Sequence, residues 1–332
     1  MNIWFSAKLT FARPRLRLLS AGLAAVLVAA CGGTDAPRYQ SVATTGELID
    51  YQVDTLNLTY SYTITESQFG LTGTTREGRL TENADGSYTP SGAPDGRVVV
   101  LSNGLLFGAV RERFGADLVT AAVVGLKDPV TTTAALAADY NYVHSGCLLT
   151  VCSVSHGTLR IAAAGTWTAC RDGNLAAGAC TGTATNGTLE SRGRGQWRLK
   201  SQDGADIGTA MGYNAAGQNV LVVDLKDQRI GGFGGGMLIG GQQLAIPATR
   251  ADSSWIAATG SGHWLEFAAI GDNIVISKID SQPTNFSVAL SPNYPWSGMV
   301  TTAWGEVGFM ADAGIYMLMT PAGDVELGVK LR

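Results

Sequence analysis

The sequence has little charge, few histidines and few cysteines. Of its 332 residues, 15% are Asp, Glu, Lys or Arg, three are His and five are Cys, whereas 43 are Gly. Surface helices usually carry many charged residues, so this composition fits poorly with a helical protein. Abundant Gly, Val, Thr and Tyr instead favour short strands joined by tight turns. We therefore expect an all-β fold.

Motifs of common catalytic and metal sites are also missing. The sequence contains no G-x-S-x-G elbow and no S-x-x-K motif, so it gives no signal for serine-hydrolase chemistry. His144, His156 and His263 are not spaced i, i+2 or i, i+4, and no preformed metal-binding face is indicated. We predict neither a metal nor a cofactor.

The first 30 residues have the layout of a secretory signal peptide. They hold four basic residues and no acid, and a mostly apolar run follows at 18–28. This run is too short to cross a bilayer, which takes roughly 20 residues. We expect residues 1–30 to be removed on export.

The end of this segment carries a more specific motif. Val28-Ala29-Ala30-Cys31 resembles the lipobox of bacterial lipoproteins, which has an aliphatic residue, two small residues and then Cys. The resemblance implies cleavage before Cys31, a diacylglycerol on its thiol and a fatty acid such as palmitate on the new amine. Two or three acyl chains hold a protein stably on a membrane. Gly32, where Asp would favour the inner membrane, implies the outer membrane of a Gram-negative cell.

The mature chain is acidic. The four basic residues of the signal segment are lost with it, which moves the net charge from −4 to about −8. An acidic chain with scattered Lys and Arg argues against nucleic acid as a partner. We expect residues 31–45 to be a lipidated flexible tether and residues 46–332 to be the all-β domain.

Repeated hairpin motifs run through this domain. A Gly-Thr-Leu segment followed at fixed spacing by Gly and Trp occupies 157–167 and recurs at 187–197, with a looser copy at 78–88. A second correspondence, between 78–128 and 187–227, includes an Asn-Gly and an Asp-Gly turn signal. The repeats predict an antiparallel meander with internal hairpin repeats.

Such a meander must hide its edges, most simply by closing into a barrel or a barrel-like sandwich. We expect this domain to fold either as one unit or as two similar halves, 46–150 and 151–332. A glycine-rich run at 231–241 lacks the lysine of a phosphate-binding loop, so close packing or bending of strands is favoured there. Its Gly-Phe-Gly and Gly-Gly patterns resemble the barrel domains of transferrin-binding surface lipoproteins, which implies a ligand-binding barrel.

The four remaining cysteines are clustered. Cys147, Cys152, Cys170 and Cys180 lie within 34 residues, and in an exported protein such a set predicts two disulfides. Of the three connectivities we favour Cys147–Cys152 and Cys170–Cys180, because the second pair flanks a turn. A four-cysteine zinc site is the alternative, although the spacing lacks paired C-x₂-C knuckles.

Aromatic residues gather in the last third of the sequence. If several share one exposed face, they can stack on sugar rings or hold an apolar ligand. The alternative is that they fill the core of a barrel. The set is Trp255, Trp264, Tyr294, Trp296 and Trp304.

These observations favour a lipid-anchored envelope protein with a binding or structural role. Its partners are expected to be the membrane, through Cys31, and an unknown protein or small ligand. The alternative is an anchored hydrolase that acts on envelope or environmental polymers with carboxylates from loops. Glu306 and Asp312 are the candidate catalytic pair.

Overall fold

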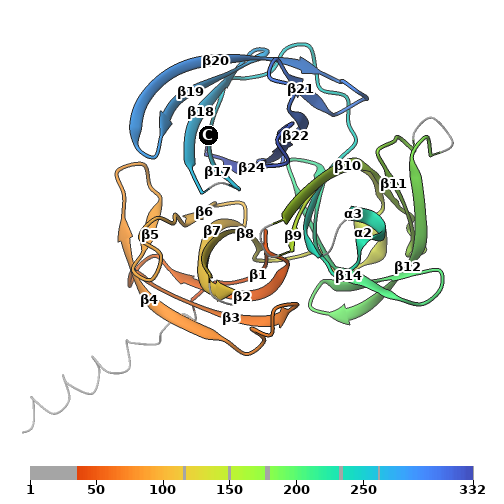
Figure 1. Ribbon diagram of the computed structural model, residues 1–332, viewed down its shortest axis with the longest axis horizontal. Helices are drawn as coiled ribbons and strands as arrows, with labels where there is room; N and C mark the ends of the chain where they lie inside the picture. The colour runs from red at the N-terminus through yellow and green to blue at the C-terminus, as the bar shows by residue number, and fades with distance from the viewer. Residues whose placement is uncertain are drawn as a thin grey trace, which may run out of the picture. The chain divides into compact units, whose positions relative to one another are not determined.

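The computed structural model describes residues 36–114, 117–148, 151–175, 180–231, 235–260 and 262–331. Pro37–Arg332 form one compact unit. Its described residues include 24 strands in three antiparallel sheets of eight strands each, and two of these sheets are closed barrels. Figure 1 shows each sheet as a ring of strands. The prediction of an all-β meander that closes into barrels is confirmed, whereas the predicted signal peptide and Cys31 lie outside the described residues.

The first sheet is a meander whose first strand pairs with its last, in the order β5-β4-β3-β2-β1-β8-β7-β6. An isolated bridge between Tyr88 and Val98 connects the two ends of this order. The strands are β1 (Arg38–Ala43), β2 (Glu47–Asp54), β3 (Thr59–Ser67), β4 (Thr75–Glu82), β5 (Tyr88–Pro90), β6 (Val99–Val100), β7 (Leu105–Phe114) and β8 (Asp117–Leu126).

Strand β1 corrects one expectation. It lies inside the segment 31–45 that we expected to be a flexible tether, and its Tyr39 and Val42 side chains are buried. The strand has only six residues, too few for their alternation to be distinguished from a polar linker. The part of the chain available as a tether is therefore shorter than expected.

The second sheet is a barrel that closes between β9 and β16. Two single-turn helices, α2 (Thr133–Leu136) and α3 (Gln228–Gly231), contribute Leu136 and Ile230 to its core. The strands are β9 (Ala138–Leu148), β10 (Val151–Ile161), β11 (Thr166–Arg171), β12 (Thr183–Gly193), β13 (Gln196–Ser201), β14 (Asp206–Ala215), β15 (Gln218–Leu225) and β16 (Gly236–Gln242).

The third sheet is a barrel that closes between β17 and β24. Large side chains, among them Trp255, Phe267 and Tyr316, pack together in its core. The strands are β17 (Ser253–Thr259), β18 (Trp264–Ile270), β19 (Asn273–Ile279), β20 (Gln282–Pro292), β21 (Val300–Thr302), β22 (Val307–Ala311), β23 (Ile315–Met319) and β24 (Val325–Lys330).

Each copy of the hairpin repeat forms a hairpin, and two of the three copies occupy equivalent strands of their sheets. The repeat at 157–167 forms hairpin β10–β11, the one at 187–197 forms β12–β13, and the looser copy at 78–88 forms β4–β5. β4–β5 and β12–β13 are the fourth and fifth strands of their sheets. The repeating unit is thus an eight-stranded meander that occurs three times, and a boundary at residue 150 falls within hairpin β9–β10. The repeats recognised in the sequence all fall in the first and second sheets, which is why the three-part division could not be predicted.

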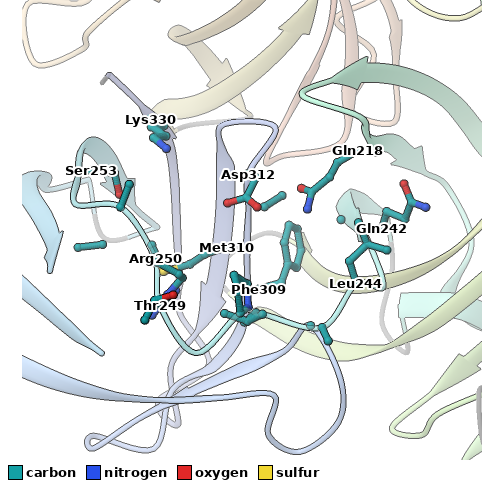
Figure 2. A pocket seen from close by; sticks show the side chains of 18 of the residues that line it. Gln218, Gln242, Leu244, Thr249, Arg250, Ser253, Phe309, Met310, Asp312 and Lys330 are labelled. Carbon is teal, nitrogen blue, oxygen red and sulfur yellow. The ribbon is translucent and has the colours of Figure 1, made fainter. Parts of the chain in front are cut away.

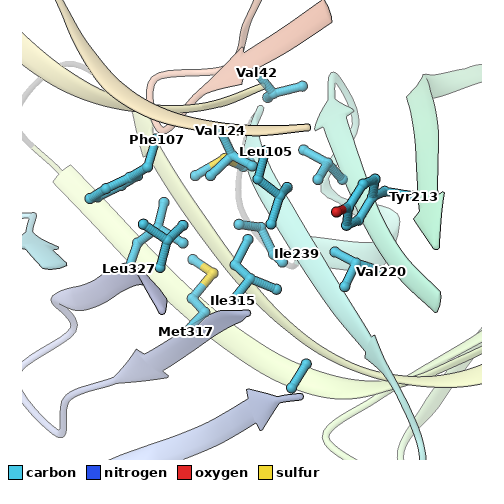
Figure 3. Close-up of a cluster of buried hydrophobic side chains, with 14 of the residues drawn as sticks. Val42, Leu105, Phe107, Val124, Tyr213, Val220, Ile239, Ile315, Met317 and Leu327 are labelled. Carbon is cyan, nitrogen blue, oxygen red and sulfur yellow. The ribbon is translucent and has the colours of Figure 1, made fainter. Parts of the chain in front are cut away.

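A hydrophobic core is shared by all three sheets. Because side chains alternate along a strand, one set faces the inside of its own sheet and the other faces the neighbouring sheets. Figure 3 shows this shared core. It includes Val42, Leu105, Phe107 and Val124 of the first sheet, Tyr213, Val220 and Ile239 of the second, and Ile315, Met317 and Leu327 of the third. A strand that is covered on both faces has a nearly continuous apolar sequence, as β15 does.

Candidate functional site

The five aromatic residues predicted as a stacking face do not share one exposed surface. Trp255 is 4% exposed and packs against Phe267 and Tyr316 inside the third barrel. Trp304 is 52% exposed and lies edge-on to Phe286. Tyr294, 61% exposed, lies in the loop after β20.

Two of the five join neighbouring sheets. Trp264 packs against Phe107 of the first sheet and donates a hydrogen bond of 2.9 Å to the Asp95 carbonyl. Trp296 donates a bond of 2.8 Å to Asn141 Oδ1 of the second barrel and stacks on His156. These contacts explain both tryptophans as parts of the interfaces between sheets.

The predicted pair Glu306 and Asp312 is not brought together. The two residues flank β22, so six residues of extended chain place them about 20 Å apart. Glu306 is 7% exposed and accepts a hydrogen bond of 2.9 Å from Thr302 Oγ1. Its electrostatic partner is Glu326: burial, followed by repulsion from Glu306, raises the pKa of Glu326 to about 7.

The cysteine predictions fall into two cases. Cys170 and Cys180 form the predicted disulfide. Cys147 and Cys152 lie opposite each other in the backbone register of β9 and β10, but their side chains lie outside the described part of the chain, so that bond stays a prediction. The Cys170–Cys180 bond removes two of the four ligands that a zinc site would need.

The histidines lie in separate places. His144 is buried, and desolvation lowers its pKa to about 4, so it is neutral at physiological pH. His156 stacks on Trp296, and His263 Nδ1 lies 2.6 Å from Asp280 on the third barrel. Within the described residues, no group of three or more His, Cys, Asp or Glu side chains is arranged to hold a metal ion. No described helix is long and apolar enough to cross a membrane.

A pocket of about 210 Å³ lies where the second barrel, the connection 243–252 and the third barrel meet; we call it the seam pocket. Figure 2 shows it. Trp255 and Phe309 contribute buried aromatic surface, and Leu244, Ile246 and Met310 add aliphatic surface. Its polar lining comes from Gln218, Gln242, Thr249, Arg250, Ser253, Asp312 and Lys330.

The charged groups of the seam pocket are incompletely paired. Arg250 Nη2 donates a hydrogen bond of 2.9 Å to the Gly271 carbonyl and lies 3.4 Å from Asp272. Its other guanidinium donors have no hydrogen-bond partner among the described residues. Among the described residues, no ion pair within 4.0 Å involves Asp312 or Lys330. Asp312 is exposed in the turn between β22 and β23, and Lys330 is half-buried on β24. Asp312 and Lys330 thus line the seam pocket with opposite charges but do not form an ion pair with each other.

This site was only partly accessible to sequence reasoning. Trp255 and Asp312 were predicted as site residues for other reasons, and both line the seam pocket. Arg250, Lys330 and the two glutamines were missed. They come from β15, β16, β24 and an irregular connection, and no local motif indicates that these segments meet.

A second hollow, of about 340 Å³, lies between residues of the first sheet and residues of the second barrel; we call it the acidic hollow. Asp224 lines it and is 1% exposed, and its Oδ1 has no hydrogen-bond partner among the described residues. Desolvation raises the pKa of Asp224 well above its ordinary value; Lys226 opposes this shift, and Glu66, Glu47 and Asp206 add to it.

Glu47 lies beside this hollow and is also 1% exposed. It accepts hydrogen bonds from Thr45 and Ser67, and desolvation nevertheless raises its pKa to about 7. Glu66, in contrast, is paired with Lys226 and Arg192. The uncompensated acids of the acidic hollow are therefore Glu47 and Asp224, which no sequence motif indicated.

Comparisons with known proteins add little to this description. No protein-family model and no curated protein matches the chain. Among nine matching solved chains is a protein of unknown function from the DUF3598 family of Nostoc punctiforme, with 10% identity, coverage of 90% of this chain and 94% of that chain, and a TM-score of 0.19. The DNA polymerase sliding clamp of Caulobacter crescentus has 8% identity, coverage of 91% and 93%, and a TM-score of 0.11. Both scores are too low to support a conclusion about this chain.

Proposed function

We propose that the protein is an outer-membrane lipoprotein, anchored through Cys31, that binds a small polar molecule in the seam pocket. The lipobox-like sequence at 28–31 supports the anchor. The binding role depends on one observation: Asp312 and Lys330 line the same hollow without an ion-pair partner among the described residues. Polar groups that converge on one hollow beside apolar side chains are found at small-molecule sites.

The anchor is tested by labelling cells with radioactive palmitate. The wild-type chain is expected to incorporate label and to fractionate with the outer membrane. The variant Cys31→Ala is expected to lose both properties, because no other thiol stands at the cleavage site. Equal labelling of the two chains would contradict the anchor.

The binding role is tested by thermal denaturation in the presence of a defined set of small molecules: amino acids, sugars, sugar phosphates, polyamines and dicarboxylates. At least one compound is expected to raise the melting temperature of the wild-type chain and not that of Asp312→Asn/Lys330→Met. A ligand that binds only the folded state at 100 times its dissociation constant adds about 2.7 kcal/mol of stability. If no compound acts in this variant-dependent way, the binding role is wrong.

A hydrolase is the second candidate, and one observation favours it. Burial raises the pKa of both Glu306 and Glu326, and repulsion from Glu306 raises that of Glu326 further. Coupled carboxyl groups with raised pKa values are found at acid–base sites. Release of fragments from purified peptidoglycan by the wild-type chain, and its loss in Glu306→Gln, would replace the binding role with this one.

A further inference from the structure

The seam pocket separates its opposite charges, and this separation restricts what can bind there. In the view of Figure 2, Lys330 and Arg250 lie on one side, Gln218 and Gln242 on the other, and Asp312 between them. Asp312 does not pair with either cation within 4.0 Å. A ligand that carries a negative and a positive charge of its own can neutralise these groups at once.

We infer that the seam pocket binds a small zwitterion with an apolar part, of the class of the free α-amino acids. This inference rests on the proposed function and names its ligand class. The ligand carboxylate is bound by Lys330 and the free donors of Arg250, and its ammonium group by Asp312. Hydrogen bonds between ionised groups are about twice as strong as neutral ones, so each end contributes to selection.

The size and lining of the pocket agree with this class. Its volume of about 210 Å³ is below the roughly 300 Å³ at which pockets for drug-sized ligands begin, so the occupant is a small molecule. Leu244, Ile246, Phe309 and Met310 provide apolar surface for a side chain.

Other ligand classes leave a charge unsatisfied. A simple anion leaves Asp312 as a repulsive neighbour, and a simple cation meets Arg250 and Lys330 in the same way. The described residues offer no group of acids or histidines that could hold a metal ion.

The test is isothermal titration of the mature lipidated chain in detergent with L-leucine and two truncated analogues. 4-Methylpentanoate lacks the ammonium group of leucine, and 3-methylbutylamine lacks its carboxylate. The wild-type chain is expected to bind leucine at least tenfold more tightly than either analogue, because each analogue loses one charged contact. L-Methionine and L-phenylalanine extend the titration to larger side chains.

Matched variants assign each contact. Asp312→Asn is expected to weaken leucine binding about tenfold but not to weaken 4-methylpentanoate binding, which should tighten because a repulsive charge is lost. Lys330→Met should likewise weaken leucine binding but not that of 3-methylbutylamine. Glu82→Gln and Lys127→Met remove the same charges at exposed positions outside the seam pocket and should bind leucine as the wild type does.

The possible outcomes separate this inference from the proposed function. Absence of binding by all three amino acids, equal binding of leucine and its analogues, or insensitivity to Asp312→Asn and Lys330→Met overturns the zwitterion. If a sugar or a phosphate then stabilises the chain in a manner that depends on Asp312 and Lys330, the binding role stands and only the ligand class is wrong. If nothing binds, both fail.

Discussion

The seam pocket and the acidic hollow both lie between neighbouring sheets, and both contain charges without a full set of partners. They differ in exposure. Asp312 of the seam pocket is exposed, whereas Glu47 and Asp224 at the acidic hollow are each 1% exposed. Burial raises the pKa of both buried acids, which extends their neutral form to higher pH. An unpaired acid is therefore available to a ligand only where solvent reaches it. A buried one instead makes the free energy of unfolding depend on pH.

The largest expected effect concerns Trp255, a buried residue that lines the seam pocket. Trp255→Ala should lower the free energy of unfolding by about 3–5 kcal/mol, because a buried tryptophan leaves a cavity when truncated. Urea denaturation followed by circular dichroism measures this change. Trp304→Ala, at a half-exposed site, is the control and should cost much less. Similar losses for both variants would show that Trp255 is not part of the core.

The next prediction concerns Glu47 at the acidic hollow, whose ionisation should make the free energy of unfolding depend on pH. A raised folded-state pKa means that the stability associated with Glu47 is fully present below pH 4.5 and is lost as the pH rises through about 7. Between these pH values the free energy of unfolding of Glu47→Gln should rise by about 3 kcal/mol relative to that of the wild type, since one pKa unit corresponds to about 1.4 kcal/mol. Urea denaturation at pH 4, 6 and 8 provides the comparison. A difference that does not change with pH would contradict the assignment.

A smaller effect is expected at the contact between the second and third barrels. Trp296→Phe keeps the aromatic ring but removes the indole N–H that donates to Asn141 Oδ1. Asn141 is 1% exposed, so an unsatisfied oxygen there should cost about 1–2 kcal/mol of unfolding free energy. Asn141 Nδ2 also donates a bond of 2.8 Å to the Ser297 carbonyl, which Asn141→Leu removes as well. Thermal denaturation of Trp296→Phe, Asn141→Leu and the double variant therefore tests the explanation, because the double variant should cost less than the sum of the two single variants.

The smallest effect belongs to the seam pocket itself. Asp312→Asn changes an exposed side chain without an ion-pair partner among the described residues, so unfolding free energy should stay within about 0.5 kcal/mol of the wild type. Chemical denaturation at pH 7 measures it. A loss above 1 kcal/mol would mean that Asp312 stabilises the fold and is not held free for a ligand.

The fold could be predicted further than the site. Turn signals such as Asn103-Gly104 and alternating strands such as β24 are local, so the antiparallel meander and its closure followed from the sequence. The Cys170–Cys180 bond was also local, since its two ends flank one turn. The number of sheets could not be predicted, because the repeats recognised in the sequence do not extend into the third sheet.

The polar sites depend on contacts between sheets, which no local pattern encodes. Glu47 and Asp224 are 177 positions apart and become neighbours only when the first sheet packs on the second barrel. Trp255 and Trp296 show that neighbours in sequence can also be separated in the fold. Both were predicted on one ligand-binding face, yet Trp255 lies in the core of the third barrel and Trp296 contacts the second barrel.

The most direct test of the central comparison is the increase in melting temperature that L-leucine produces in the wild type, Asp312→Asn and Glu47→Gln at pH 8. Glu47→Gln is expected to melt at a higher temperature than the wild type and to keep the full leucine-dependent increase. Asp312→Asn should melt like the wild type without ligand and, at 100 times the wild-type dissociation constant, show only about half of that increase. If Asp312→Asn keeps the increase while Glu47→Gln loses it, the ligand is bound at the acidic hollow and the account is contradicted.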